Sequence, residues 1–205
     1  MKQPTRQQIQ EAKDYIKLRL RAEISMQDNL EKALLQAANE IVGISMRYGI
    51  KPSFFRFSAN KELNDEVNKV LDKLRGIIYD YTETLSVYDR ENDRDAIVAF
   101  INREDHGKTL SERISIYSNR FKYELEAAIA AGMIAGIGSE KIKDNIKANL
   151  KSPYSDPYFK RAVEGGNSSA TRIKTDGISY GVGKSNSAYN SLNTLTRFVV
   201  GSAWM

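Results

Sequence analysis

Steps of three and four residues separate the apolar side chains along most of this chain. That spacing places them on one face of an α-helix, because an α-helix completes a turn about every 3.6 residues. We therefore predict an all-α fold, built of helical hairpins and a bundle, with a loosely packed basic C-terminal segment. With 205 residues and 41% hydrophobic content, the chain is long enough to bury a sizeable core.

Two apolar stripes follow each other near the N-terminus. Thr5 and Gln8 have the spacing of a capping box, which starts a helix. The first stripe comprises Ile9, Ala12, Ile16, Leu20 and Ile24, and the second comprises Met26, Leu30, Ala33, Ala37, Ile41 and Ile44. Because the phase shifts near residues 25–28, we expect either one kinked helix or two consecutive amphipathic helices. Gly49 and Pro52 end the helical pattern.

The segment Ser53-Phe54-Phe55-Arg56-Phe57 is short and aromatic, so it either plugs the core or forms a brief strand, and we favour the plug. Asn60 is a good N-cap, and an apolar stripe over residues 63–85 predicts a second long helix with a wide packing face. A short helix over residues 96–101 follows. Residues 1–102 therefore form a predicted N-terminal helical region.

A polar link containing Gly107 leads into a second predicted helical region, residues 109–205. Thr109-Leu110-Ser111-Glu112 forms another capping box, and the helix that follows becomes rich in small residues over 127–132, which lets another backbone approach closely. The turn Gly136-Ile137-Gly138-Ser139 then joins it to a further helix, with Ser139 as the expected N-cap. These elements predict a helical hairpin with a tight glycine turn.

The chain contains no Cys and a single His, and these counts exclude most site chemistry. Disulfide scaffolds, thiolate nucleophiles, zinc–thiolate sites, most His-ligated metal sites and the usual Ser-His-Asp relay are all excluded. His106 lies in a polar loop beside acidic residues, where a surface role is the expectation. We accordingly expect no catalytic residue, no metal ion and no cofactor.

Three further patterns resemble functional sites but lack features that such sites need. Residues 177–185 resemble a phosphate-binding P-loop, but five residues instead of four separate the first Gly from Gly-Lys-Ser, and no apolar strand precedes them. The acidic run from Asp89 lacks the Gly and Glu that a calcium-binding EF-hand loop needs at its sixth and twelfth positions. Glu124 and Glu126 point to different faces of a helix, so their spacing does not make an acid/base pair.

The strongest positive signal is a basic, Tyr-rich C-terminal segment. Residues 141–205 hold ten basic and four acidic side chains, within a chain of formal net charge +5. In such a segment, either the Tyr rings stack on nucleic-acid bases while Lys and Arg bind phosphates, or the same side chains pack at a protein interface. We favour the protein interface. The candidate partner-binding or nucleic-acid-binding residues are Lys151, Tyr154, Lys160, Arg161, Arg172, Lys174, Tyr180, Lys184 and Trp204.

The chain ends on an unusually apolar sequence that includes Phe198, Val199, Val200 and Trp204. If these side chains are not folded back onto the chain, they form an exposed hydrophobic patch that calls for a partner or for self-association. Fluorescence of the single Trp tests this alternative.

Residues 109–205 resemble the minor head protein family of tailed bacteriophages that is named after the F protein of phage Mu. The resemblance is carried by the capped helix from Thr109 to Gly132, the glycine turn 136–139, the helix that follows it, and Lys174-Thr175-Asp176. That tripeptide is similar to the family's basic-Thr-acidic signature, and Trp204 lies near the family's Trp. The resemblance implies a low-copy structural protein of the portal vertex and capsid interior, which acts in head assembly or DNA delivery without catalysis.

From this resemblance we expect contacts with portal or other capsid proteins, self-association, and DNA near the basic tail, in the virion or the host cytoplasm. The polar N-terminus does not read as a signal peptide, and we expect neither membrane association nor a small-molecule substrate. The alternative function is a helical nucleic-acid-binding module that uses the same basic segment. An enzyme is the weakest hypothesis, because no acid/base constellation emerges.

Overall fold

The computed structural model describes residues 3–88, 90, 93–168, 170–171 and 187–204. The fold of these residues is all-α, which confirms the predicted class. The helices are α1 (Arg6–Arg47), α2 (Lys61–Val87), α3 (Arg94–Asn102), α4 (Leu110–Ile134), α5 (Ser139–Asn149), α6 (Pro157–Glu164) and α8 (Ala188–Ala203), with short 3-10 turns η1 (Pro52–Phe54), η2 (Phe57–Ala59) and η4 (Pro153–Ser155).

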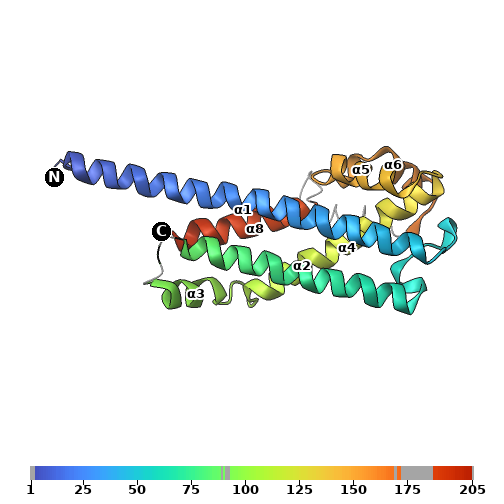
Figure 1. Ribbon diagram of the computed structural model, residues 1–205, viewed down its shortest axis with the longest axis horizontal. Helices are drawn as coiled ribbons and strands as arrows, with labels where there is room; N and C mark the ends of the chain where they lie inside the picture. Colours follow the sequence, from blue (N-terminus) through green and yellow to red (C-terminus); the bar gives the residue numbers. More distant parts are fainter. Residues whose placement is uncertain (1–2, 89, 91–92, 169, 172–186, 205) are drawn as a thin grey trace.

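Helices α1, α2, α4 and α8 run alongside one another and enclose the main hydrophobic core (Figure 1). Helices α5 and α6 cover α4 near its C-terminal end, while α3 lies beside α2 near the end of α8. Side chains from both predicted regions, 1–102 and 109–205, contribute to this main core. The two regions therefore pack as one bundle.

Helix α1 is one continuous helix, and only its second stripe is buried. Thr5 caps it with the predicted capping box, and the second stripe from Met26 to Ile44 lies in the core. The first stripe is not buried, because Ile9, Ile16, Leu20 and Ile24 are exposed. Ile16, Leu20 and Ile24 lie on a side of α1 that no described helix covers, although Ala22 among them is buried and Arg19 and Glu23 line a cleft with α8. Helix α1 has 42 residues and α2 has 27. At about 1.5 Å per residue, α1 is roughly 20 Å longer than α2 and extends beyond the bundle (Figure 1).

The aromatic segment after α1 plugs the core, as favoured from the sequence. Phe55 and Phe57 are buried with their rings edge to face, while Phe54 faces solvent. Asn60 then caps α2, because its side chain accepts a hydrogen bond from the Leu63 backbone N–H at 3.0 Å. The plug thus closes the end of the bundle where α1 passes to α2.

The predicted hairpin of α4 and α5 is present. Its turn needs glycine, because Gly136 has φ +70, a backbone conformation that other residues rarely adopt. The N-cap of α5 is Gly138, and Ser139 is already helical, so the prediction that Ser139 caps this helix is wrong. Close packing needs Gly132, since a Cβ there would lie 2.6 Å from Cγ1 of Ile142.

The described part of the C-terminal segment is not loosely packed, which corrects the sequence-based expectation. Ser187 caps α8, and the inner face of α8 is buried between α1, α2 and α4. The buried hydrophobic residues of this face are Ala188, Tyr189, Leu192, Leu195, Val199 and Val200. A weak stripe of apolar residues was therefore enough to make α8 a core helix, because three neighbouring helices cover it.

Candidate functional site

Lys151 and Tyr154, two of the predicted partner-binding residues, make contacts within the chain. Lys151 Nζ lies 2.9 Å from the carboxylate of Glu31 on α1 and 5.3 Å from the ring centre of Tyr189 on α8. Its pKa is raised, chiefly by the hydrogen bond to Glu31. Lys151 therefore links the loop after α5 to two core helices.

Tyr154 is part of a small polar cluster against α4. Its hydroxyl accepts a hydrogen bond from Arg120 Nη2 at 2.8 Å and donates one to Glu124 Oε1 at 3.2 Å. Burial raises the pKa of Tyr154 to about 12, and its ring packs edge to face on Phe159. These contacts indicate a structural role for Tyr154.

Of the remaining predicted residues, Lys160 and Arg161 lie exposed on α6. The Arg161 guanidinium stacks over the Tyr158 ring, 5.1 Å from its centre. The other four, Arg172, Lys174, Tyr180 and Lys184, lie outside the described residues, as do the P-loop-like stretch 177–185 and the tripeptide Lys174-Thr175-Asp176.

Trp204 is buried, so it does not form an exposed partner-binding residue as predicted. Its indole N–H donates to the Leu85 carbonyl at 3.2 Å, and the Arg90 guanidinium lies 4.4 Å from its ring centre. Tyr15 packs on the same ring and donates its hydroxyl hydrogen to the Trp204 carbonyl. Trp204 therefore ties the end of α8 to α1 and α2. Within the apolar terminus it is Phe198 that remains exposed, at 63%.

The neighbouring carboxylates Glu124 and Glu126 are both buried and serve different elements. Glu124 Oε1 accepts a hydrogen bond from the Ala188 backbone N–H at 2.9 Å, at the start of α8. Burial is the main cause that raises the pKa of Glu124 to about 7. Glu126 Oε2 instead accepts from the Phe57 backbone N–H at 2.8 Å, in the aromatic plug. Each carboxylate thus holds a segment of backbone, and the two do not face a common substrate position.

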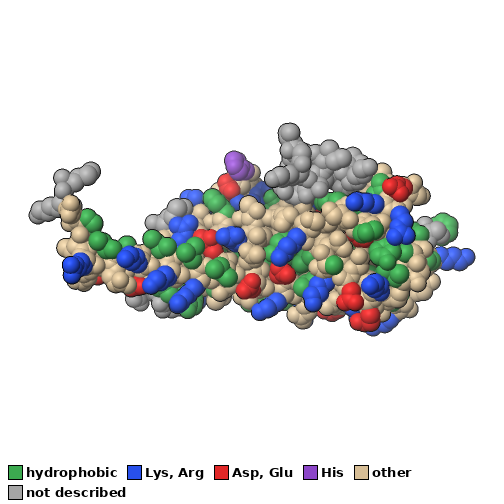
Figure 2. Space-filling model, turned by 90° about the horizontal axis from the view of Figure 1, so that it is seen from above, with side chains coloured by type: hydrophobic (Ala, Val, Ile, Leu, Met, Phe, Trp, Pro, Cys, Tyr) green, Lys and Arg blue, Asp and Glu red, His purple; other side chains and the backbone are tan. Residues whose placement is uncertain are grey.

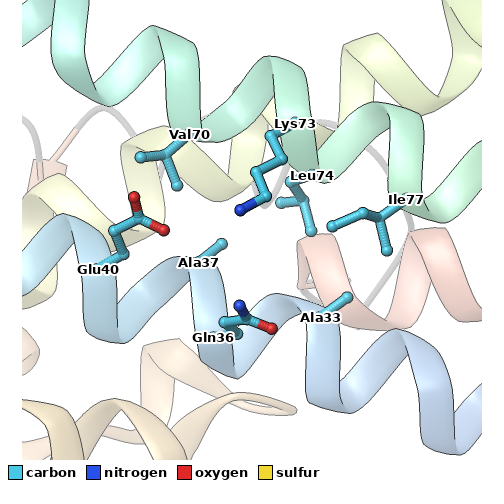
Figure 3. A pocket seen from close by; sticks show the side chains of 8 residues that line it. All are labelled: Ala33, Gln36, Ala37, Glu40, Val70, Lys73, Leu74 and Ile77. Carbon is cyan, nitrogen blue, oxygen red and sulfur yellow. The ribbon is translucent and has the colours of Figure 1, made fainter.

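The concave regions of the described surface include a narrow groove and two open clefts. Between α1 and α2, Gln36 and Glu40 face Lys73 across a groove of about 10 Å³, which is room for roughly one water molecule (Figure 3). One cleft of about 360 Å³ lies beside the plug and includes Arg56 and Lys122. Another of about 360 Å³ lies between α1 and α8. Among the described residues, no group of three His, Asp or Glu side chains is arranged to hold a metal ion.

The most distinctive surface is an apolar patch that the sequence analysis did not identify as a site. We call Ile16, Leu20, Ile24 and Phe198 the α1 patch; their exposed fractions are 54%, 50%, 58% and 63%. Ile9 continues the row toward the N-terminus with 42% exposure. Figure 2 shows hydrophobic side chains along the projecting part of α1, together with Lys and Arg side chains. The spacing of the apolar residues correctly predicted one face of a helix. Among the described residues, no other element covers that face.

A charged network lies beside the α1 patch and is satisfied within the chain. Glu23 on α1 binds Arg19 Nε at 3.1 Å and Arg197 Nη2 at 3.3 Å. Arg19, Glu23 and Phe198 line the same cleft between α1 and α8. Phe198 therefore lies at the level of residues 19–23 of α1.

Comparisons with known proteins do not assign this chain to a family. No family model and no solved structure matches this chain. The chain is 30% identical over 108 residues to flavin-containing monooxygenase 5 from Homo sapiens, and 28% identical over 108 residues to the protein of the same name from Oryctolagus cuniculus. Each match covers 45% of this chain and 20% of the other protein. The chain thus spans about a fifth of the length of these curated proteins.

None of the described helices is both long enough and apolar enough to cross a membrane. The exposed stripe on α1 alternates with charged residues such as Lys13, Asp14 and Lys17, so it is one face of an amphipathic helix.

Proposed function

We propose that this chain is a structural head protein of a tailed bacteriophage or prophage, which acts in head assembly or DNA delivery through protein–protein contacts and without catalysis. The observation that carries the proposal is the α1 patch, four large apolar side chains of which each is half exposed or more. Contiguous exposed apolar surface of this kind is typical of protein interaction sites. The phage context comes from the resemblance of residues 109–205 to the minor head protein family.

Flavin chemistry is not part of the proposal, although the two similar mammalian proteins carry flavin in their name. Dinucleotide-binding folds place the pyrophosphate on a glycine-rich turn between a β-strand and a helix. The regular structure of the described residues consists of helices, and these residues contain no such strand–turn–helix unit. The shared stretch also spans only a fifth of the monooxygenases.

The phage assignment is tested by looking for the chain in particles. Expressed from its own genetic locus, the protein should co-purify with nuclease-resistant, DNA-filled particles and be detected there by mass spectrometry. Particles in which other head proteins are found and this chain is absent would overturn the assignment.

The contact role of the α1 patch is tested by thiol labelling. An introduced thiol reacts without background, because the chain has no Cys. In the dilute purified Leu20→Cys variant the thiol should react rapidly with a maleimide. In extracts that contain the native assemblies it should react at least about tenfold more slowly, because a partner covers it. Glu11→Cys is the matched control, since Glu11 is exposed on the opposite side of α1 and should react equally fast in both. Equal rates for Leu20→Cys in both samples would contradict the contact role.

The alternative, a nucleic-acid-binding module, is favoured by one observation: Lys160 and Arg161 are exposed together on α6, with Tyr158 beneath Arg161. Light scattering coupled to size-exclusion chromatography, at low and high salt and with or without a DNA duplex, separates the two functions. Association that survives high salt and ignores DNA supports the structural protein. A chain that moves onto DNA only at low salt supports the alternative, because phosphate contacts weaken steeply with ionic strength.

A further inference from the structure

We propose that the cleft beside the aromatic plug binds a phosphate group of a nucleic-acid backbone. Its hydrogen-bond donors come from three parts of the fold: Arg56 and Ser58 from the plug, Lys122 from α4, and Ser168 from the residues after α6. The cleft shares no residue with the α1 patch, so the inference goes beyond the proposed function and does not depend on it. The unused donors, the charge and the shape of the cleft support it.

Arg56 has hydrogen-bond donors that the chain does not use. Its guanidinium carries five N–H groups, and one of them, on Nη2, donates to Ser168 Oγ. No other acceptor for this side chain lies among the described residues, and Arg56 is exposed. The bond to Ser168 orients the guanidinium at the cleft. The remaining N–H groups can therefore bind an oxyanion, for which a planar guanidinium is well suited.

Lys122 supplies a second cation, and its position is fixed. Its ammonium donates to Oδ1 of Asn64 and to Oδ1 of Asn68, at 2.7 Å each, and lies 6.0 Å from the ring centre of Phe57. Because an ammonium has three N–H groups, one donor is left without a partner among the described residues. Burial is the main cause that lowers the pKa of Lys122. An anion in the cleft would stabilise the charged form of this partly buried side chain.

The charge of the cleft matches that of a phosphodiester. Two of its lining residues, Arg56 and Lys122, are cationic, and one, Glu126, is anionic. Glu126 Oε2 is bound to the plug, where it accepts a hydrogen bond from the Phe57 backbone N–H at 2.8 Å. The lining therefore has one positive charge in excess. A phosphodiester of a nucleic acid carries one negative charge, whereas a phosphate monoester carries nearly two.

The arrangement of the donors suits a tetrahedral group. The guanidinium of Arg56, the ammonium of Lys122 and the hydroxyls of Ser58 and Ser168 line the cleft from different elements. A phosphodiester offers oxygens in four directions, whereas a carboxylate offers two oxygens in one plane. The volume of about 360 Å³ lies at the lower end of the range for small-ligand sites. The cleft thus has room for a phosphate and part of the sugar beside it.

The test is binding of a fluorescein-labelled single-stranded DNA of about 12 nucleotides to the full chain, followed by fluorescence anisotropy at several salt concentrations. Arg56→Gln should weaken binding about tenfold, because a charged contact to a phosphate is lost. It should also reduce the slope of the log association constant against log salt concentration by about 0.7, the value for one phosphate of a single strand. A merely structural role of Arg56 would leave that slope unchanged, and an unchanged slope would overturn the inference.

Arg103→Gln is the matched control. Arg103 is exposed and stacks on Phe100, 4.3 Å from its ring centre, just after α3 and at the opposite end of the bundle from the plug (Figure 1). The variant makes the same chemical change and removes the same charge, so affinity and salt slope should stay at their wild-type values. Equal weakening by Arg56→Gln and Arg103→Gln would indicate diffuse attraction to the whole surface and would overturn the cleft.

A second variant places a negative charge in the cleft. Ser58 is exposed, so Ser58→Glu should leave the melting temperature unchanged and weaken DNA binding at least about tenfold by repulsion of the phosphate. Binding that survives Ser58→Glu and Arg56→Gln but is lost in the double variant Lys160→Gln, Arg161→Gln would place the phosphate on α6 and overturn the cleft.

Two further measurements identify the source of the phosphate. A methylphosphonate oligonucleotide of the same sequence lacks the backbone charge and should bind at least about tenfold more weakly. Inorganic phosphate, titrated alone by calorimetry, should bind more weakly than the DNA, and equal affinities would overturn the nucleic-acid source. A wild-type chain that does not bind the DNA at low salt up to about 100 µM would overturn the inference. Labelling of Leu20→Cys reports separately on the α1 patch, so the proposed function can stand or fall independently.

Discussion

Glu124 should make the stability of this protein fall as the pH rises from about 4.5 to about 7. Its carboxyl group is buried beneath α8, and desolvation raises its pKa from 4.5 in the unfolded chain to about 7. Because the folded-state pKa is the higher one, the folded chain retains a proton that the unfolded chain has already released in this range. The linkage relation then gives a loss of about 3 kcal/mol across the window, complete above pH 7.

Glu124→Gln removes this dependence. Gln keeps an oxygen that can accept from the Ala188 N–H and the Tyr154 hydroxyl, but it does not ionise. Relative to wild type, the free energy of unfolding of the variant should therefore rise by about 3 kcal/mol between pH 4.5 and pH 8. The assay is urea unfolding followed by Trp204 fluorescence at several pH values, since that Trp is buried at the C-terminal end of α8, the helix whose first backbone N–H Glu124 binds.

Glu140→Gln is the control, because it makes the same chemical change at an 82% exposed side chain. Its unfolding free energy should follow that of wild type at every pH. Curves for Glu124→Gln that also run parallel to wild type between pH 4.5 and pH 8 would refute the reasoning, since they would mean that the folded environment of Glu124 does not favour its neutral form.

Three further predictions follow from local geometry. Gly132→Ala should lower the unfolding free energy by about 1–3 kcal/mol, because the new Cβ would lie 2.6 Å from the Ile142 side chain. Gly76→Ala should raise it by about 0.5–1 kcal/mol, because no atom lies within 4 Å of the new Cβ. Chemical denaturation measures both changes. Thr109→Ala should cost about 1 kcal/mol through loss of the α4 capping box, and thermal melts measure it. Trp204 emission should be blue-shifted and shielded from iodide in the native chain, and a red-shifted, quenchable spectrum would contradict its burial.

Local signals in the sequence predicted the helices and their ends. Thr5 and Thr109 cap helices as expected, and Gly136 forms the turn of the α4–α5 hairpin, because each depends on only a few neighbouring residues. The stripes of α1 show where this reasoning stops. Periodicity identifies an apolar face, but whether that face is covered depends on which sides of the helix its neighbours occupy. Met26 lies on the buried side of α1, and Ile16 lies on its exposed side.

The functional surface was harder to predict than the fold. Basic and aromatic residues near the C-terminus were singled out by composition, and the structure uses Lys151, Tyr154 and Trp204 for contacts within the chain. Those contacts join residues far apart in sequence, such as Tyr15 and Trp204, which are 189 positions apart. A spacing rule within one helix does not reveal such partners. The exposure of Leu20 and the burial of Glu124 both follow from the same long-range arrangement.

The contact between Tyr15 and Trp204 also sets the order in which the chain can fold during synthesis. At about 5–20 residues per second, a ribosome needs roughly 10–40 s to make the stretch that separates these two residues. Throughout that interval α1 can pair with α2, while the groove that receives α8 stays empty. The nascent chain is thus a partly assembled intermediate with uncovered apolar surface until α8 emerges. A chaperone that binds nascent chains would meet this protein in that state, and docking of α8 would end the exposure.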